Sequence, residues 1–220
     1  MYDFNFAAIL RFWPMFLSGV WMTLWLSALA FVVSLALGLV VVLVRISQKR
    51  ALALAAVVYT ALFRGVPLLV LLIWIYYALP ILTSISISVF WTAILGIGTH
   101  MAAFVAEDYR AGLSAIPTAQ AESARALGMS YWATFRRILL PQALRIIVGP
   151  LVNSYIVTLK GTALLVVFSF PELMYVGTSL SEATFRPLEI LTVVGALYFV
   201  IAFAVSALGS HLERRFAREF

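Results

Sequence analysis

The chain has 220 residues, of which 64% are hydrophobic and only 11% are charged, and its mean hydropathy is +1.06. A soluble domain carries roughly a quarter charged residues, so this composition excludes an ordinary soluble protein. The formal net charge is +6, and in a membrane protein an excess of Lys and Arg reports topology rather than a nucleic-acid partner. The chain has no cysteine, which excludes disulfides, thiolate catalysis and Cys-based metal sites.

Five apolar stretches are long enough to cross a bilayer, whose hydrocarbon core takes roughly 20 residues of helix. We predict transmembrane helices over about 16–44, 51–79, 89–110, 146–168 and 190–212, and hence an all-α polytopic membrane protein formed as a single domain over 1–220. Ahead of the first span, apolar residues around Arg11 have the spacing of a short interfacial helix that ends near Pro14. A frayed terminus is the alternative.

Basic residues gather in three segments, 45–50, 110–145 and 214–218. The positive-inside rule assigns all three to the cytoplasm, which places the N-terminus outside and the C-terminus inside. The connection between the fourth and fifth spans contains Glu172, Glu182, Arg186 and Glu189, is net acidic, and is expected as an outer loop. No internal repeat suggests the duplicated halves of many secondary transporters.

The segment from about 112 to 142 is the longest stretch expected in water. Within it the chain reads Glu122-Ser123-Ala124, three residues, Gly128, nine residues, and then ILLP at 138–141. We expect a short helix that Gly128 ends, because glycine adopts positive φ without steric cost. Its small residues let another protein approach closely, while Glu122 and Arg125 offer charged partners to that protein or pair with each other.

A second short helix is expected after Gly128. Trp132, Phe135 and Ile138 recur at helical spacing, which predicts an apolar stripe that lies on the membrane-facing body of the protein. An amphipathic surface helix without any partner is the alternative, but the length of the spaced motif favours a docking segment.

The spacing resembles the EAA loop of the permease subunits of binding-protein-dependent ABC importers, with Ser123 in place of the first alanine. Four further segments resemble the branch for polar amino acids and related solutes, which includes histidine, glutamine, glutamate, arginine and opine permeases. They are FRGVPLL at 63–69, the run from AFVAE at 103–107 through RAGL and SAIP to Gln120, NS with LKGTAL at 153–164, and FRPLE at 185–189. The resemblance covers nearly the whole chain.

The resemblance implies a type I ABC importer permease that forms half of a translocation pathway for a small polar solute, an amino acid, in the bacterial inner membrane. It implies that Glu122, Ser123, Ala124, Arg125 and Gly128 couple to a cytoplasmic ABC ATPase dimer. The other implied partners are a second permease subunit, identical or related, and an extracytoplasmic solute-binding protein. It leaves the particular solute and the choice between homodimer and heterodimer open.

Polar residues inside the apolar stretches are costly to insert and mark a pathway or a buried pair. Arg64 lies beside Gly65 and Pro67, which can break the helix and free backbone groups. We expect Arg64 either to face the pathway and meet a substrate carboxylate, or to pair with a buried acid or backbone carbonyls that hold the subunit together. The candidate pathway residues are Arg64, Gly65, Pro67, His100, Glu107, Asn153, Lys160 and Thr162. Glu107 would receive a cationic substrate or sit at headgroup level. His100 would line a polar pocket or, as we expect, be a hydrogen-bonded packing residue. Lys160 would line the pathway or snorkel to the cytoplasmic interface.

The chain contains no GxxxxGK[ST] loop, so we expect it to bind no cofactor and to leave ATP hydrolysis to the partner ATPase. It has no expected catalytic residue or metal site. A membrane hydrolase would need a nucleophile with a nearby base, but the two histidines, His100 and His211, lie far apart in the sequence. A secondary transporter would show ion-coupling carboxylates at mid-membrane, and a purely structural subunit would bind an ATPase without stimulation by solute.

Overall fold

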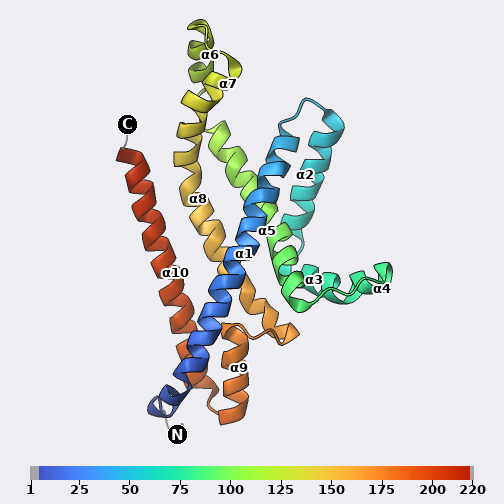
Figure 1. The fold of residues 1–220 in the computed structure, drawn as a ribbon, viewed down its shortest axis with the longest axis vertical. Helices are drawn as coiled ribbons and strands as arrows, with labels where there is room; N and C mark the ends of the chain where they lie inside the picture. Colours follow the sequence, from blue (N-terminus) through green and yellow to red (C-terminus); the bar gives the residue numbers. More distant parts are fainter. Residues whose placement is uncertain (1–4, 219–220) are drawn as a thin grey trace.

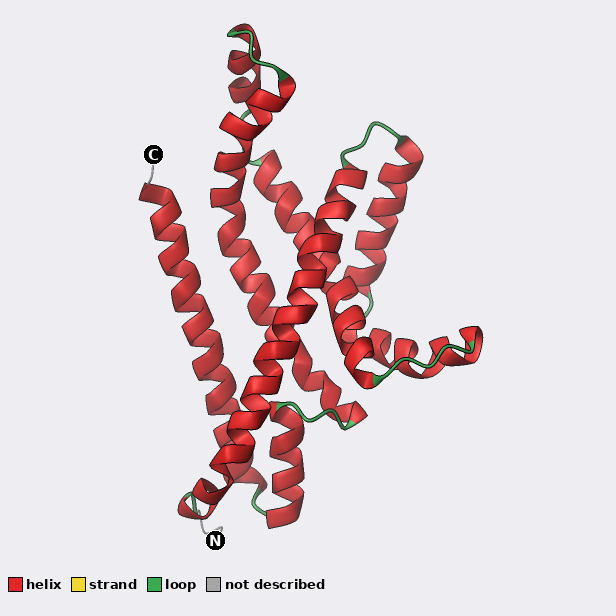
Figure 2. Ribbon diagram, viewed as in Figure 1, coloured by secondary structure: helices red, strands yellow, loops and turns green. Residues whose placement is uncertain are grey.

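The computed structural model describes residues 5–218, and over that range the chain forms helices and loops with no strand (Figures 1 and 2). The elements are η1 (Ala7–Phe12, a 3-10 helix), α1 (Trp13–Arg45), α2 (Arg50–Gly65), α3 (Leu68–Ile73), η2 (Trp74–Ala78, a π-helix), α4 (Leu79–Thr83), α5 (Val89–Ser114), α6 (Thr118–Ala126), α7 (Tyr131–Thr134), η3 (Phe135–Leu139, a π-helix), α8 (Leu140–Gly161), η4 (Thr162–Phe168, a 3-10 helix), α9 (Leu173–Thr184) and α10 (Pro187–Arg218). Of the basic tail at 214–218, only the Arg214 side chain lies among those described.

Four continuous helical rods are long and apolar enough to cross a membrane: Ile9–Arg45, Val89–Ser114, Tyr131–Phe168 and Pro187–His211. A fifth crossing is formed if the bent pair Arg50–Gly65 and Leu68–Thr83 counts as one span. The all-helical polytopic fold is therefore confirmed. The rod that contains the predicted span 146–168 begins much earlier, at Tyr131, because hydropathy detects only the apolar part of a helix that continues through charged residues.

The second predicted span, 51–79, is not one straight helix. Its two halves meet at 103°, because Val66 and Pro67 both adopt extended ψ angles of 130° and 135°. A residue before proline is disfavoured in the α region, and proline has no N–H to continue the helical ladder. The polar cluster at 64–67 therefore breaks the helix, as its composition predicted, and sends α3, η2 and α4 sideways as an arm (Figure 1).

The long helices α1 and α5 form the centre of the molecule. The buried stripe of α1 is made largely of small residues, among them Gly19, Ser27, Ala30, Ser34 and Gly38. A Cβ added at Gly38 would lie 2.8 Å from a Val105 methyl group on α5. Small residues allow this close approach, which supplies van der Waals contact where lipid gives no hydrophobic drive to helix association.

Different helices and connections lie at the two ends of the molecule. Figure 1 places α6, α7, the α1–α2 connection and the C-terminal end of α10 toward one end, and η1, α9 and the start of α10 at the other. The expected interfacial segment before Pro14 is the short helix η1. The expected acidic loop between the last two spans is instead largely the helix α9, and two of its acids, Glu172 and Glu189, are fully buried.

Candidate functional site

The helix α6 carries the motif at 122–128 and ends as the sequence predicts. Gly128 has a φ of +76°, and its N–H donates to the Arg125 carbonyl at 2.9 Å while the Met129 N–H reaches back to the Ala124 carbonyl at 3.1 Å. This hydrogen-bonded cap satisfies the last carbonyls of the helix and reverses the chain. Ser130 then caps α7 by accepting from the Ala133 N–H at 3.3 Å.

Most residues of the motif on α6 are exposed, and one alanine is buried. Glu122, Ser123 and Arg125 are exposed, whereas Ala124 is 1% exposed and packs inward. The Arg125 Nε donates to the Ala121 carbonyl at 3.3 Å, and no ion pair joins Glu122 to Arg125 in the part of the chain that the structure describes. Among the described residues, Glu122 and Arg125 therefore do not pair with each other, and both side chains are exposed.

The apolar stripe expected after Gly128 is only partly packed on the protein, since Phe135 and Ile138 are half-buried. Trp132 is 66% exposed and stacks on Phe135 with their ring centroids 5.8 Å apart, and Leu127 and Tyr131 are also largely exposed. The reason is that α7 is not a separate helix: it continues through the π-helix η3 into α8 and projects with that rod. The apolar side chains consequently border α6.

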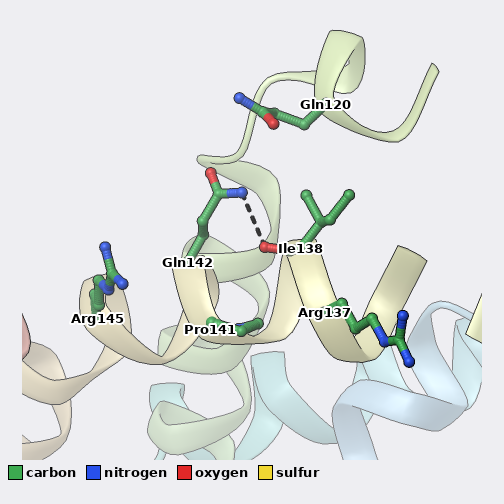
Figure 3. A pocket seen from close by; sticks show the side chains of 6 residues that line it. All are labelled: Gln120, Arg137, Ile138, Pro141, Gln142 and Arg145. Carbon is green, nitrogen blue, oxygen red and sulfur yellow. Dashed lines mark hydrogen bonds between the residues drawn. The ribbon is translucent and has the colours of Figure 1, made fainter. Parts of the chain in front are cut away.

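A cavity of about 340 Å³ lies where α6 approaches the η3–α8 rod (Figure 3). It is lined by Gln120 from α6 and by Arg137, Ile138, Pro141, Gln142 and Arg145 from the rod. Gln142 donates from Nε2 to the Ile138 carbonyl at 2.8 Å, which fixes its carboxamide beside the cavity. Of these residues, Gln120, Ile138 and Pro141 lie in motif runs that the sequence shows, but none of them was predicted to have a site role.

A charged cluster joins α1, α2 and α5. Glu107 accepts from Arg45 and, at 2.8 Å, from the Nε of Arg110, and the Arg64 guanidinium lies 4.0 Å from the same carboxylate. The cations outnumber the acid, and ionisable groups within a span are normally paired in this way. Both readings of Glu107 from the sequence were incomplete, since it is an ion-pair centre for three helices.

Arg64 is the least constrained cation of this cluster. Its side chain is 48% exposed, and its guanidinium lies over the Phe104 ring, 5.5 Å from the centroid. The neighbouring acid Asp108 accepts from the Ser154 hydroxyl at 2.6 Å and links α5 to α8. Arg64 therefore has an acid nearby and remains accessible, so features of both predicted roles are present.

The other candidate pathway residues do not form one site. His100 is buried and packs on Phe104 at 5.4 Å, but its Nδ1 has no hydrogen-bond partner among the described residues, unlike the hydrogen-bonded packing residue expected. Asn153 and Lys160 are exposed on α8. Thr162 is buried and donates to the Leu159 carbonyl at 2.8 Å. Gly65 and Pro67 lie at the bend after α2.

Lys160 borders a separate cavity of about 350 Å³ between η4, α9 and α10. Ala163, Met174 and Tyr198 are among its lining residues, so its walls are largely apolar around one ammonium group. Within the described residues, no group of three or more His, Cys, Asp or Glu side chains could hold a metal ion.

An anchor that was not predicted from the sequence lies at the other end of the molecule. Glu172 is fully buried and caps α9 by accepting from the Tyr175 N–H at 2.8 Å. Its Oε2 also accepts from the Tyr198 hydroxyl at 2.6 Å and from the Thr23 hydroxyl at 3.4 Å. Burial raises the pKa of Glu172, and these hydrogen bonds oppose that rise. The acid thus joins α9 to α1 and α10.

These features define an all-helical membrane protein with a broken second span and an exposed, charged helix α6 between two spans. The family model described as "Binding-protein-dependent transport system inner membrane component" matches residues 34–218. The chain belongs to this family, and it is therefore an inner-membrane permease component of a binding-protein-dependent transport system.

Relatives whose names state a transported amino acid are similar to this chain in sequence over nearly its full length. The chain is 34% identical to the arginine transport system permease protein of Bacillus subtilis (strain 168), over 97% of each chain. It is 34% identical to the glutamine transport system permease protein of Escherichia coli (strain K12), over 97% of this chain and 98% of that one. It is 31% identical to the glutamate/aspartate import permease protein of Escherichia coli O157:H7, over 99% and 100%.

Solved structures support the same fold. A crystal structure of an amino acid ABC transporter with histidines matches with a TM-score of 0.92 at 34% identity, over 97% of this chain and 100% of that one. A subunit from an inward-facing methionine ABC transporter matches with a TM-score of 0.77 at 23% identity, over 94% and 99%, and shows the fold alone. The permease fold predicted from the EAA spacing is therefore confirmed.

Proposed function

We propose that this chain forms half of the membrane pathway of an ATP-driven uptake system for a polar amino acid. The observation that carries the proposal is the exposed helix α6, whose Glu122 and Arg125 face outward in a chain of this permease family. The substrate class rests on the relatives, which transport arginine, glutamine, and glutamate or aspartate according to their names.

The coupling surface of α6 has distinct parts. Glu122, Ser123 and Arg125 would contact the ATPase directly, because their side chains are exposed. Ala124 would act by its small size, since it packs inward and sets how closely α6 approaches the rod. Gly128 would fix the direction in which α6 projects through its positive φ. The chain itself binds no cofactor in this proposal, and the partner ATPase binds and hydrolyses ATP.

The proposed topology places the N-terminus outside and the C-terminus in the cytoplasm. Its support is the arrangement of the basic segments in Figure 1: the α1–α2 connection, α6 with α7, and the end of α10 lie toward the same end of the molecule. Lys and Arg near span ends favour the cytoplasmic side. The opposite end, with α9 and η1, would then meet the extracytoplasmic solute-binding protein.

Within the pathway, Arg64 would bind a substrate carboxylate. Its guanidinium is accessible, lies over Phe104, and is not in direct hydrogen-bonding distance of Glu107. Arg45 and Arg110 already neutralise Glu107, so Arg64 retains positive charge for a carboxylate, which guanidinium binds in a bidentate manner. A second permease subunit, identical or related, would supply the other half of the pathway.

The test is ATP hydrolysis by this chain reconstituted with its partner ATPase, with and without the binding protein loaded with single amino acids. We expect stimulation by one liganded binding protein and its loss in Glu122→Lys. Glu213→Lys is the matched control, because Glu213 is an exposed glutamate on α10 rather than α6. Solute uptake without any ATPase, or no ATPase association at all, would contradict the proposal.

A further inference from the structure

The turn between α6 and α7 exposes three large apolar side chains. Leu127 and Tyr131 are each 83% exposed, and Trp132 is 66% exposed. These three residues, which fall within six consecutive positions, form what we call the apolar turn. Apolar side chains that gather at one exposed place on a folded protein mark a site of contact with another molecule.

The apolar turn lies in water, whereas other exposed apolar side chains of this chain lie within spans that lipid covers. The rod from Tyr131 to Phe168 has 38 residues, which makes it about 57 Å long against about 40–45 Å for a bilayer with its headgroups. Figure 1 shows α7 beyond the C-terminal end of α10 along the long axis of the molecule. The first residues of the rod therefore project past the membrane surface, and lipid does not cover the apolar turn.

The backbone holds the apolar turn in a defined conformation. Gly128 reverses the chain with a φ of +76°, and Ser130 caps α7 by accepting from the Ala133 N–H at 3.3 Å. The Trp132 ring stacks on Phe135 with their centroids 5.8 Å apart. Side chains that are already ordered lose less conformational freedom when a partner binds. The turn is thus a preorganised surface.

The charges beside the apolar turn indicate the chemistry of its partner. Arg125 precedes the turn and Arg136 and Arg137 follow it, and all three side chains are exposed. The segment 123–145 contains no Asp or Glu. Aromatic residues and arginine are enriched in protein–protein interfaces, where an apolar centre has a polar rim. The surface therefore fits a soluble protein with an apolar pocket bordered by acidic residues.

The apolar turn is continuous with the surface of α6. Leu127 directly follows the last residue of α6, and Glu122 and Arg125 are exposed on that helix. A protein that docks on α6 therefore meets the turn as well. We infer that the apolar turn inserts into an apolar pocket of the partner ATPase and supplies affinity that the charged motif of α6 does not. This inference rests on the proposed function, in which the ATPase docks on α6.

The experiment measures the affinity of the separately purified ATPase for the full-length permease in nanodiscs, with Trp132→Ala as the decisive variant. We expect about a tenfold or greater loss of affinity, because a buried tryptophan is among the costliest residues to truncate in an interface. Trp132→Phe keeps an aromatic ring and should lose no more than about threefold. Because the contact is apolar, the loss in Trp132→Ala should be the same at ionic strengths of about 0.1 M and about 1 M.

Trp21→Ala is the matched control, because Trp21 is 68% exposed but lies on the spanning rod Ile9–Arg45. It should change the affinity for the ATPase by no more than about twofold. Equal losses in Trp132→Ala and Trp21→Ala would overturn the inference. A loss in Trp132→Ala that disappears at high salt would show an electrostatic contact, and a loss in nanodiscs that is absent in detergent micelles would show that the turn acts through lipid headgroups. Either result overturns the inference too.

The experiment separates this inference from the proposed function. If the wild-type permease binds the ATPase and Trp132→Ala binds it equally well, the apolar turn is not an anchor and the coupling role of α6 stands. A change of Trp132→Ala from dimer to monomer, with unchanged affinity for the ATPase, would assign the turn to a second copy of this chain and overturn the inference. If the wild type itself does not bind the ATPase, the proposed function fails.

A second variant keeps the test decisive if Trp132→Ala is not monodisperse in size-exclusion chromatography. Tyr131→Ser leaves the stack of Trp132 on Phe135 in place and removes a ring that is almost wholly exposed. It should lower the affinity for the ATPase by about threefold or more. An unchanged affinity in a monodisperse Tyr131→Ser protein would then overturn the inference.

Discussion

The helices α6 and α9 are both short connections between spans, yet they are attached to the molecule in opposite ways. The acid before α9 is buried and hydrogen-bonded to Thr23 on α1 and Tyr198 on α10, whereas α6 makes its main contacts with the adjoining α7 and η3. In the proposed function the exposed face of α6 is left for the ATPase, so α6 draws little stability from the rest of its own chain. Substitutions at the two ends should therefore differ in what they disturb.

The largest expected effect is at the α9 anchor. Glu172→Ala removes the acceptor for Tyr198, Thr23 and the Tyr175 N–H. Leaving such buried donors unpaired should lower the free energy of unfolding by about 3 kcal/mol. Unfolding by sodium dodecyl sulfate in mixed micelles measures this change. Glu182→Ala, an exposed acid on the same helix, should change it by less than about 0.5 kcal/mol, and equal effects would contradict the anchoring role.

The difference between the two segments also explains what the sequence could predict. The α6 motif is local: the residues at 122–128 specify a helix, its cap and its exposed charges within seven positions. The α9 anchor is not local, because Glu172 meets Thr23, which lies 149 positions earlier in the chain. A net acidic connection indicates an exposed loop when its partners are unknown, and so the helix and its buried acid were missed.

The second prediction tests how closely α9 approaches α1. A Cβ added at Gly19 would lie 2.9 Å from the Leu173 backbone Cα, so Gly19→Ala should force the two segments apart. Overpacking of this kind costs about 1–3 kcal/mol. Gly195→Ala is the control, since no atom lies within 4 Å of its added Cβ, and it should not lower stability. The mixed-micelle titration distinguishes them, and a neutral Gly19→Ala would show that α9 can shift.

The charged cluster lies between these extremes of predictability. Arg64 and Glu107 could be selected from the sequence because charges within apolar stretches require partners. It did not pair them, and it assigned Arg45 and Arg110 only to topology, because their convergence on Glu107 depends on how α1, α2 and α5 pack. The small-residue stripe of α1, with Gly38 against Val105, sets part of that packing. A search for acids one or two turns from basic span ends would have found Glu107 as an ion-pair candidate.

A smaller effect concerns pH. Burial raises the pKa of Glu172 above its ordinary value of 4.5, so the folded protein holds this proton more tightly than the unfolded chain. The free energy of unfolding of the protein should therefore fall as pH rises between the ordinary and the raised pKa of Glu172. Glu172→Gln does not titrate, and the stability of wild type relative to this variant should decline over that interval. A difference that stays constant with pH would contradict the burial effect on this carboxyl.

The smallest expected effect on global stability is at the end of α6. Gly128→Ala places a Cβ at a φ of +76°, which costs roughly 1–2 kcal/mol for a residue in the left-handed region. Apart from its own chain neighbours, no atom lies within 4 Å of that Cβ, so the strain is confined to the local backbone and is relieved by rearrangement of α6 alone. The unfolding titration should hardly change, while binding-protein-stimulated ATP hydrolysis should fall because α6 loses its direction. A global loss as large as that of Gly19→Ala would mean that α6 is part of the folded core, and the contrast between the two ends would no longer hold.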